Sequence, residues 1–311
     1  MLENFLTVAQ NVLALFILIG VGFCCQRFKL LNDAAVKACA NLVLYIATPC
    51  VIIKSCIREF DASLLTGFLV MAAVATVNFA ILILIAQVCF RDKDEGRRRV
   101  LRFATVFSNA GYMGIPLQQA ILGDEGVFYC AAYIIVHNIV MWTYGAVCMS
   151  GDKRDLSGKK LLLNPGIIGV AVGMALFLLS VPVPTLVTDA VGHLATLNTP
   201  VPMIIVGYYM AQTDILGALR DKKSYLCIAL RLIAVPLLAL GGLLLVGVRG
   251  AVLTSCLICI CAPVATATTM FSTRHERDTL LSVNLVSIST LFAVATMPII
   301  VALAQYLGGV L

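Results

Sequence analysis

Two hydrophobic segments of the chain are interrupted by glycine, proline and small polar residues, at matching positions in its two halves. The first interruption runs from Asn109 to Pro116 and the second from Cys261 to Thr269. Glycine allows strained or left-handed backbone, and proline removes an amide donor and blocks the helical bond behind it. In hydrocarbon an unpaired backbone group is costly, so such a break is stable only where it faces protein or a water-filled cavity. Paired breaks of this kind are typical of transporter substrate sites.

The breaks predict a binding site for an organic anion. A half-helix that begins near the middle of a membrane presents amides with partial positive charge, which can hold a carboxylate without a buried Lys or Arg. The opposing half-helix ends offer carbonyls suited to a cation. We expect the substrate-binding residues at the breaks to be Asn109, Gly111, Gly114, Pro116, Pro263, Thr266 and Thr268. The polar side chains among them could also satisfy carbonyls released by the two prolines.

A second polar feature lies between the breaks. Tyr129, Tyr133 and His137 recur every four residues and therefore share one helix face. The offset of 147 residues that separates Pro116 from Pro263 relates His137 to Asn284. An ionisable group in the middle of a span is usually functional, so we add Tyr133, His137 and Asn284 to the candidate substrate site. The alternative for His137 is a neutral ring that hydrogen bonds a neighbouring helix.

The composition indicates an integral membrane protein. Hydrophobic residues make up 61% of the 311 residues, charged residues 12%, and the mean hydropathy is +1.00. The start of the chain has no basic segment and no small-residue cleavage site, so we expect a retained first span and not a signal peptide. Ten spans of suitable length are predicted, and their short connections leave no room for a soluble domain. These spans are 7–25, 35–57, 63–90, 101–121, 125–149, 163–181, 186–212, 223–247, 250–272 and 279–307.

The distribution of basic residues predicts the orientation. With ten spans and an external N-terminus, 18 of the 22 Lys and Arg residues fall in or beside the cytoplasmic loops, as the positive-inside rule requires. We therefore expect a multi-pass protein of the plasma membrane with both termini extracytoplasmic. The net charge of +6 is a topology signal and does not indicate nucleic acid. Arg231, within the eighth span, is expected to extend to the inner interface.

Five spans per half is an odd number, so the second half enters the membrane upside down. Ala47-Thr48-Pro49 in span two corresponds to Asn198-Thr199-Pro200 in span seven, and the prolines of spans four and nine also correspond. The predicted fold class is all-α integral membrane, with ten transmembrane helices as a 5+5 inverted repeat and broken crossover helices four and nine. The repeats comprise residues 1–150 and 151–311. Chance placement of prolines is the alternative.

The chain resembles the auxin efflux carrier family, including bacterial members described as malate or malonate permeases. The resemblance rests on Asn109-x-Gly111-x-x-Gly114-x-Pro116, Asn164-Pro165, Pro263 and, more weakly, Ser289-Thr290. It implies a scaffold from spans 1, 2, 6 and 7 and a transport domain from spans 3–5 and 8–10. The long cytoplasmic loop of the plant carriers is absent, so neither its regulation nor auxin as substrate is carried over. The more distant bile acid–sodium symporters share a similar layout.

These observations predict a secondary carrier for small organic anions, such as mono- or dicarboxylates, that works by alternating access. The alternatives are a sodium-coupled symporter of the bile-acid type, an anion channel and, least favoured, an intramembrane enzyme. No Asp or Glu lies in the centre of a span, so coupling would use His137, a protonated substrate or sodium. We expect no catalytic residues, no metal site and no cofactor, and we interpret the twelve cysteines as small buried hydrophobes. A homodimer is expected, and the Gly169-xxx-Gly173 pair would serve either scaffold packing or the dimer contact.

Overall fold

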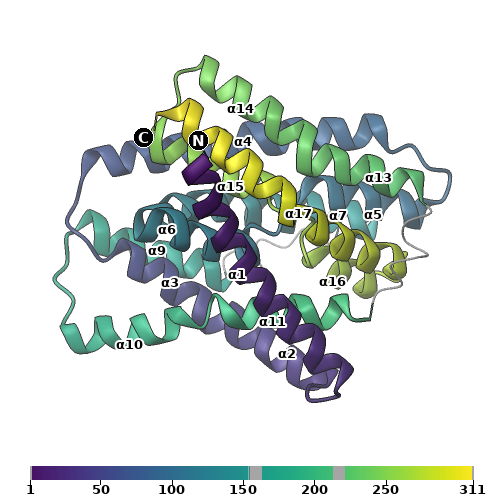
Figure 1. The fold of residues 1–311 in the computed structure, drawn as a ribbon, viewed down its shortest axis with the longest axis horizontal. Helices are drawn as coiled ribbons and strands as arrows, with labels where there is room; N and C mark the ends of the chain where they lie inside the picture. Colours follow the sequence, from purple (N-terminus) through teal and green to yellow (C-terminus); the bar gives the residue numbers. More distant parts are fainter. Residues whose placement is uncertain (1, 153, 155–162, 213–220, 310–311) are drawn as a thin grey trace.

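The protein is helical throughout the part that the computed structural model describes, residues 2–152, 154, 163–212 and 221–309. Within these ranges there is no strand, and the one extended contact is an isolated antiparallel bridge between Ser108 and Val264. The start of α1 and the end of α17 lie near each other in the view of Figure 1.

In the first half, two of the five predicted spans are single helices and the other three are divided into shorter pieces. Their bounds are α1 Leu2–Arg27, α2 Asp33–Leu42, η1 Val43–Ala47, α3 Thr48–Cys56, α4 Ala62–Cys89, α5 Glu95–Val106, η2 Ala110–Gly114, α6 Ile115–Val140, η3 Met141–Gly145 and α7 Ala146–Ser150. In the second half they are α9 Pro165–Leu178, α10 Thr185–Thr196, α11 Pro200–Met210, α13 Lys222–Ala229, η5 Leu230–Ala234, α14 Val235–Leu245, α15 Gly250–Cys261, α16 Ala267–Arg274 and α17 Thr279–Gly308.

Seven helical stretches of the described residues are long and apolar enough to cross a membrane. Two shorter apolar helices, Pro165–Leu178 and Gly250–Cys261, accompany them. One of the seven, Ala110–Ser150, spans 41 residues and is interrupted at Gly123, where φ is 62° and ψ is −149°. The chain is therefore a multi-pass membrane protein, whereas the ten-span inverted repeat stays a prediction.

Local sequence explains where many helices begin. Six of them follow an Asn or Asp whose side chain accepts a hydrogen bond from an amide two or three residues later, which satisfies donors that have no partner inside the helix. These residues are Asn32, Asp61, Asp94, Asn164, Asp221 and Asp278. Asn164-Pro165 thus opens α9 as the sequence predicts.

Prolines explain three of the four π-helical turns in the described residues. The turns η1, η2 and η5 end at Ala47, Gly114 and Ala234, each two residues before a proline. A proline inside a helix removes one amide donor and its ring collides with the carbonyl four residues earlier. A wider turn just before the proline relieves that collision, so these helices continue past the proline.

Two helix pairs pack closely enough to require glycine. In the pair α1–α11, a Cβ on Gly22 would lie 2.1 Å from the Ile204 carbonyl oxygen, and one on Gly207 would lie 1.9 Å from the Ile19 oxygen. In the pair α3–α9, Gly169 and Gly173 approach Pro49 and Cys56. The Gly169-xxx-Gly173 pair therefore packs inside one chain, and homodimerisation stays a separate prediction.

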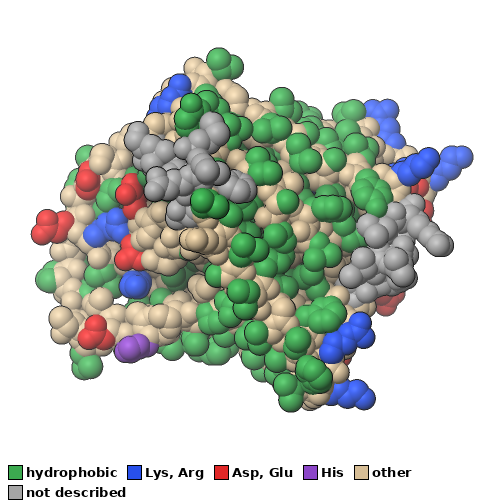
Figure 2. Space-filling model, in the orientation of Figure 1, with side chains coloured by type: hydrophobic (Ala, Val, Ile, Leu, Met, Phe, Trp, Pro, Cys, Tyr) green, Lys and Arg blue, Asp and Glu red, His purple; other side chains and the backbone are tan. Residues whose placement is uncertain are grey.

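The surface in Figure 2 carries a broad cover of hydrophobic side chains between two ends that differ in charge. Lys and Arg gather at the right-hand end, whereas Asp and Glu are more numerous at the left-hand end. Asp92 of the α4–α5 loop accepts from the Lys223 ammonium at 2.7 Å and pairs with Arg97 at 3.2 Å. The hydrogen bond from Lys223, together with the nearby cations, lowers the pKa of Asp92. These ion pairs join the loop to the start of α13.

Candidate functional site

The two interruptions predicted from the sequence meet in one place. The first lies between α5 and η2, at residues 107–109, and the second between α15 and α16, at residues 262–266. The Asn109 amide donates to the Pro263 carbonyl at 2.8 Å, and the Ala265 amide donates to the Phe107 carbonyl at 3.0 Å. We call these two segments the crossing. Because each break pairs with the other, backbone groups released by both are satisfied there.

A side chain from α17 holds the second segment of the crossing. The Ser289 hydroxyl accepts from the Val264 amide at 3.1 Å and donates to the Val286 carbonyl at 3.1 Å. The neighbouring Thr290 donates to the same Val286 carbonyl at 2.7 Å. Ser289 is thus a positioning residue for the crossing.

Arg231, in the π-turn η5, reaches the other side of the crossing. Its side chain is completely buried, and its guanidinium donates to the carbonyls of Thr105, Val106, Ile260 and Ala262 at 2.9–3.4 Å. These carbonyls belong to the ends of α5 and α15. The expectation that Arg231 extends to the membrane interface is therefore wrong, because these carbonyls bind its guanidinium inside the protein.

Aromatic residues enclose the helix face that carries His137. The imidazole ring lies 5.7 Å from the Phe79 ring and 5.6 Å from the Phe107 ring, and it hydrogen bonds the backbone of Ser108. The Tyr133 hydroxyl lies 3.4 Å from the Ser108 hydroxyl. Tyr133 and His137 therefore both contact the first segment of the crossing. Tyr129, one turn earlier, lies instead against Gly67 of α4.

Four of the predicted substrate residues carry a buried polar atom without a hydrogen-bonding partner among the described residues. These atoms are Asn109 Nδ2, His137 Nε2, Thr268 Oγ1 and Asn284 Oδ1. Asn109 and Thr268 are 4% and 0% exposed. A buried polar group that forms no hydrogen bond is destabilising by about 1–3 kcal/mol. Such atoms at a break that joins two helices are candidates for contact with a ligand.

Comparison with known proteins identifies the family to which the chain belongs. The profile of the membrane transport protein family matches residues 7–301, nearly the whole chain. The chain belongs to this family, that of the auxin efflux carriers. It is 24% identical over 296 residues to an uncharacterized transporter of Methanocaldococcus jannaschii, covering 91% of this chain and 94% of that one. It is 21% identical over 299 residues to an uncharacterized transporter of Methanothermobacter thermautotrophicus, covering 95% and 98%.

At the first break, the backbone conformation of the glycines and the position of the proline differ from the prediction. Neither Gly111 nor Gly114 has a positive φ, so the backbone there is not of the left-handed kind that the sequence suggested. No atom lies within 4 Å of the place where a Gly111 Cβ would stand, and Gly111 is partly exposed. Pro116 lies beyond the break, buried in the first turn of α6. The prediction that Pro116 breaks span four is therefore wrong, and π-turn η2 absorbs its effect.

At the second break the sequence located the interruption correctly. Pro263 lies inside the crossing and supplies the carbonyl that Asn109 contacts. Thr266 immediately precedes α16, makes no side-chain cap bond and is partly exposed. Neither the contacts of Arg231 at the crossing nor the part played by Ser108 was predicted from the sequence. The signal that could have found Arg231 is its position in an otherwise apolar span, five residues before Pro236.

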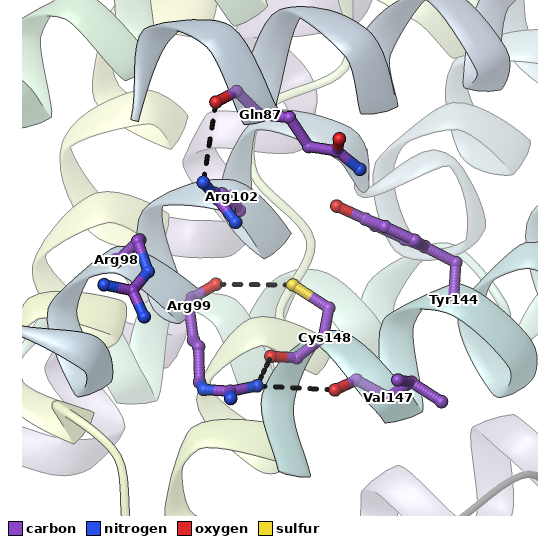
Figure 3. A pocket seen from close by; sticks show the side chains of 7 residues that line it. All are labelled: Gln87, Arg98, Arg99, Arg102, Tyr144, Val147 and Cys148. Atoms are coloured by element: carbon purple, nitrogen blue, oxygen red, sulfur yellow. Dashed lines mark hydrogen bonds between the residues drawn. The ribbon is translucent and has the colours of Figure 1, made fainter. Parts of the chain in front are cut away.

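A pocket of about 160 Å³ lies away from the crossing, between the end of α4, α5 and the η3–α7 segment (Figure 3). Arg102 donates to the carbonyls of Phe90 and Gln87, and Arg99 donates to those of Val147 and Cys148. Arg99 also pairs with Glu95. Since backbone carbonyls and Glu95 accept from these guanidinium groups, the pocket is part of the helix-end packing.

Proposed function

We propose that the protein is a secondary carrier for small organic anions, such as mono- or dicarboxylates, that works by alternating access around the crossing. The observation that carries this proposal is the pairing of the two broken helices beside a fully buried guanidinium. No Asp or Glu is buried anywhere in the described residues. The centre of the molecule therefore has positive character and favours a negatively charged substrate.

The start of η2 is the part of the crossing best suited to hold a carboxylate. The first amides of a helix have no partner inside it and carry partial positive charge. Here they adjoin the unpaired Asn109 Nδ2, a further donor, and the open space beside Gly111. A carboxylate in this space would accept hydrogen bonds without the need for a Lys or Arg contact.

The surroundings of η2 suggest which parts move against each other. Tyr112 of η2 packs against a small hydrophobic cluster, separate from the main core, formed by Val36, Val43, Ile205 and Tyr208. These residues belong to α2, η1 and α11, which the family resemblance assigns to the scaffold. Four residues of the crossing belong instead to the main core, which residues of α1, α3 and α9 also help to form: Phe107, Ala262, Val264 and Ala265. A substrate at Gly111 would thus lie between scaffold and transport domain, where a movement of one against the other could expose it to either side.

Contacts between corresponding residues support the inverted repeat. The Thr48 hydroxyl donates to Asn198 Oδ1 at 2.8 Å, so the two related proline motifs touch, as the two breaks also do. The glycine-mediated pair α1–α11 joins span one to span seven, and the pair α3–α9 joins span two to span six. In the inverted repeat, span one corresponds to span six and span two to span seven. A two-fold relation therefore converts one pair into the other. The 41-residue stretch Ala110–Ser150 yields two spans when it is divided at Gly123. Together with the six other long stretches and the two shorter apolar helices, these make ten spans.

A proteoliposome screen tests the proposal. Purified protein is reconstituted and uptake of labelled malonate, malate, acetate and a neutral control, glycerol, is measured under imposed proton and sodium gradients. We expect saturable uptake of at least one carboxylate and none of glycerol beyond empty liposomes. Carboxylate uptake no faster than in empty liposomes under every gradient, or equal permeation of glycerol, would contradict an organic anion carrier.

A further inference from the structure

Arg231 is a fully buried cation at the point where two helices end. Its guanidinium Nε donates to the Ala262 carbonyl at 3.3 Å, Nη2 to Ile260 at 2.9 Å, and Nη1 to Thr105 and Val106 at 3.3 and 3.4 Å. No ion pair to a carboxylate is found for it within the described residues. The acceptors around this buried cation are these four backbone carbonyls and the side chain of Tyr133.

These carbonyls form the kind of environment that binds inorganic cations. The last carbonyls of a helix accept no hydrogen bond inside it and carry partial negative charge. In transporters with broken helices, such half-helix ends and unwound carbonyls coordinate the coupling ion. Here the ends of α5 and α15 converge on one point, and the planar guanidinium occupies that point with donors directed at both.

We propose that Arg231 is a built-in cation that joins the ends of α5 and α15 in place of a coupling Na⁺, so that the transport cycle needs no inorganic cation at the crossing. This inference rests on the proposed function, because it assumes that the transport cycle works by alternating access around the crossing. A covalently attached charge is not released to either side of the membrane. No sodium gradient is therefore used at this position, and the positive charge persists when an anion leaves.

The first test needs no substrate. Thermal unfolding of the purified wild-type protein in detergent is measured in NaCl and in choline chloride at equal ionic strength. A ligand that binds only the folded state raises the melting temperature as its concentration exceeds its Kd. We expect the same melting temperature in both salts. A rise of several degrees that is specific to Na⁺ would contradict the proposal, because it would reveal a sodium site that Arg231 does not fill.

The second test removes the guanidinium and returns it as a free ion. R231A should melt several degrees below wild type, and low-millimolar guanidinium chloride, well below denaturing concentrations, should restore part of the loss. Arg249 provides the matched control, because it too donates to backbone carbonyls, that of Leu244 near the end of α14 and that of Val248 in the following loop, but is exposed. R249A should show little loss and no rescue. Wild-type stability in R231A, or equal effects of guanidinium on both variants, would overturn the proposal.

A conservative variant covers the case in which R231A does not fold. R231K keeps the charge, but a lysine ammonium is a point charge that cannot direct donors at both helix ends. We expect R231K to fold with a melting temperature below that of wild type and to be stabilised by neither Na⁺ nor guanidinium. Stability equal to wild type in R231K would contradict a role for the guanidinium plane.

Transport then separates this inference from the proposed function. If malonate or malate is taken up, its rate should be the same with Na⁺ or choline on both sides, and a severalfold dependence on Na⁺ would overturn the inference alone. If no carboxylate is transported, the proposed function fails, while the melting temperatures still decide whether Arg231 takes the place of a cation.

Discussion

At the scale of single residues, the polar groups of the crossing fall into two sets. Ser289 and Thr290 both hydrogen bond backbone groups of the protein through their hydroxyls. Asn109 and Thr268 each retain a buried atom without a partner in the described part of the chain. Because an unmade buried hydrogen bond is costly, we assign the first pair to structure and propose the second for substrate contact.

The space beside Gly111 gives a direct test of the binding site. A Cβ there would meet no atom within 4 Å, so G111V should fold with nearly wild-type thermal stability. We expect its carboxylate uptake to fall at least about tenfold, since the loss of one good ligand contact of about 1.4 kcal/mol already gives that factor. The measurement is initial uptake per folded protein.

Gly192 of α10 is the matched control for Gly111, because no atom lies within 4 Å of the place where its Cβ would stand either. G192V should leave uptake unchanged. Unchanged uptake in G111V as well would show that the substrate does not use this space.

The surroundings of His137 favour a structural task. Its ring packs against Phe79 and Phe107 and bonds the Ser108 backbone, and a glutamine amide can share such a bond. H137Q should therefore lower uptake only a fewfold and keep the wild-type dependence on pH between about 5 and 8, the range in which histidine titrates. H193Q, which changes an exposed histidine of α10, is the control. A flattened pH profile in H137Q alone would instead assign proton coupling to this ring.

At the scale of helices, the sequence located the interruptions but not their mechanism. Asn109 and Pro263 lie in the crossing as predicted, because a break between apolar runs leaves a clear compositional signal. The predicted helix break at Pro116 is wrong, because a proline either breaks a helix or is accommodated by a wider turn such as η2. The sequence alone does not distinguish these two outcomes. The structure also interrupts predicted span seven between Thr196 and Pro200, where the sequence shows only the proline motif. Contacts between distant segments, above all those of Arg231, depend on tertiary packing that local patterns do not encode.

The close contact of α1 and α11 predicts a stability effect. A methyl group on Gly207 would overlap the Ile19 carbonyl oxygen at 1.9 Å, so the helices must separate. Such overpacking typically destabilises by about 1–3 kcal/mol, and G207A should lower the melting temperature by several degrees. G192A, with free space, should be neutral or slightly stabilising. Equal melting temperatures for G207A and wild type would show that α1 and α11 are not in close contact.

At the scale of the whole molecule, composition was sufficient for the fold class. An apolar chain with short polar connections is all-helical and multi-pass, as the structure confirms over its described residues. The number of spans does not follow from helix length alone, because a span that is broken in the middle consists of helices too short to be counted as membrane-spanning. The proposed division into scaffold and transport domain depends on packing between the halves, which the Thr48–Asn198 contact illustrates.

The charge asymmetry predicts the orientation of the molecule. Basic residues of the α4–α5 region, among them Arg97, should face the cytoplasm and both termini the outside. In a cysteine-free background, a single cysteine at position 97 should react with a membrane-impermeant maleimide only after permeabilisation, and one at position 3 should react in intact cells. The opposite labelling pattern would reverse the orientation.

The central claim is that the crossing serves a carrier and not a channel, and counterflow measures this most directly. Proteoliposomes loaded with an unlabelled carboxylate, the one that gives the fastest uptake, are diluted into a trace of the same labelled anion without any ion gradient. A carrier that exposes one site alternately should accumulate label transiently above the external concentration, and G111V should abolish this overshoot. Label that only equilibrates, at a rate unaffected by the internal anion, would contradict alternating access at the crossing.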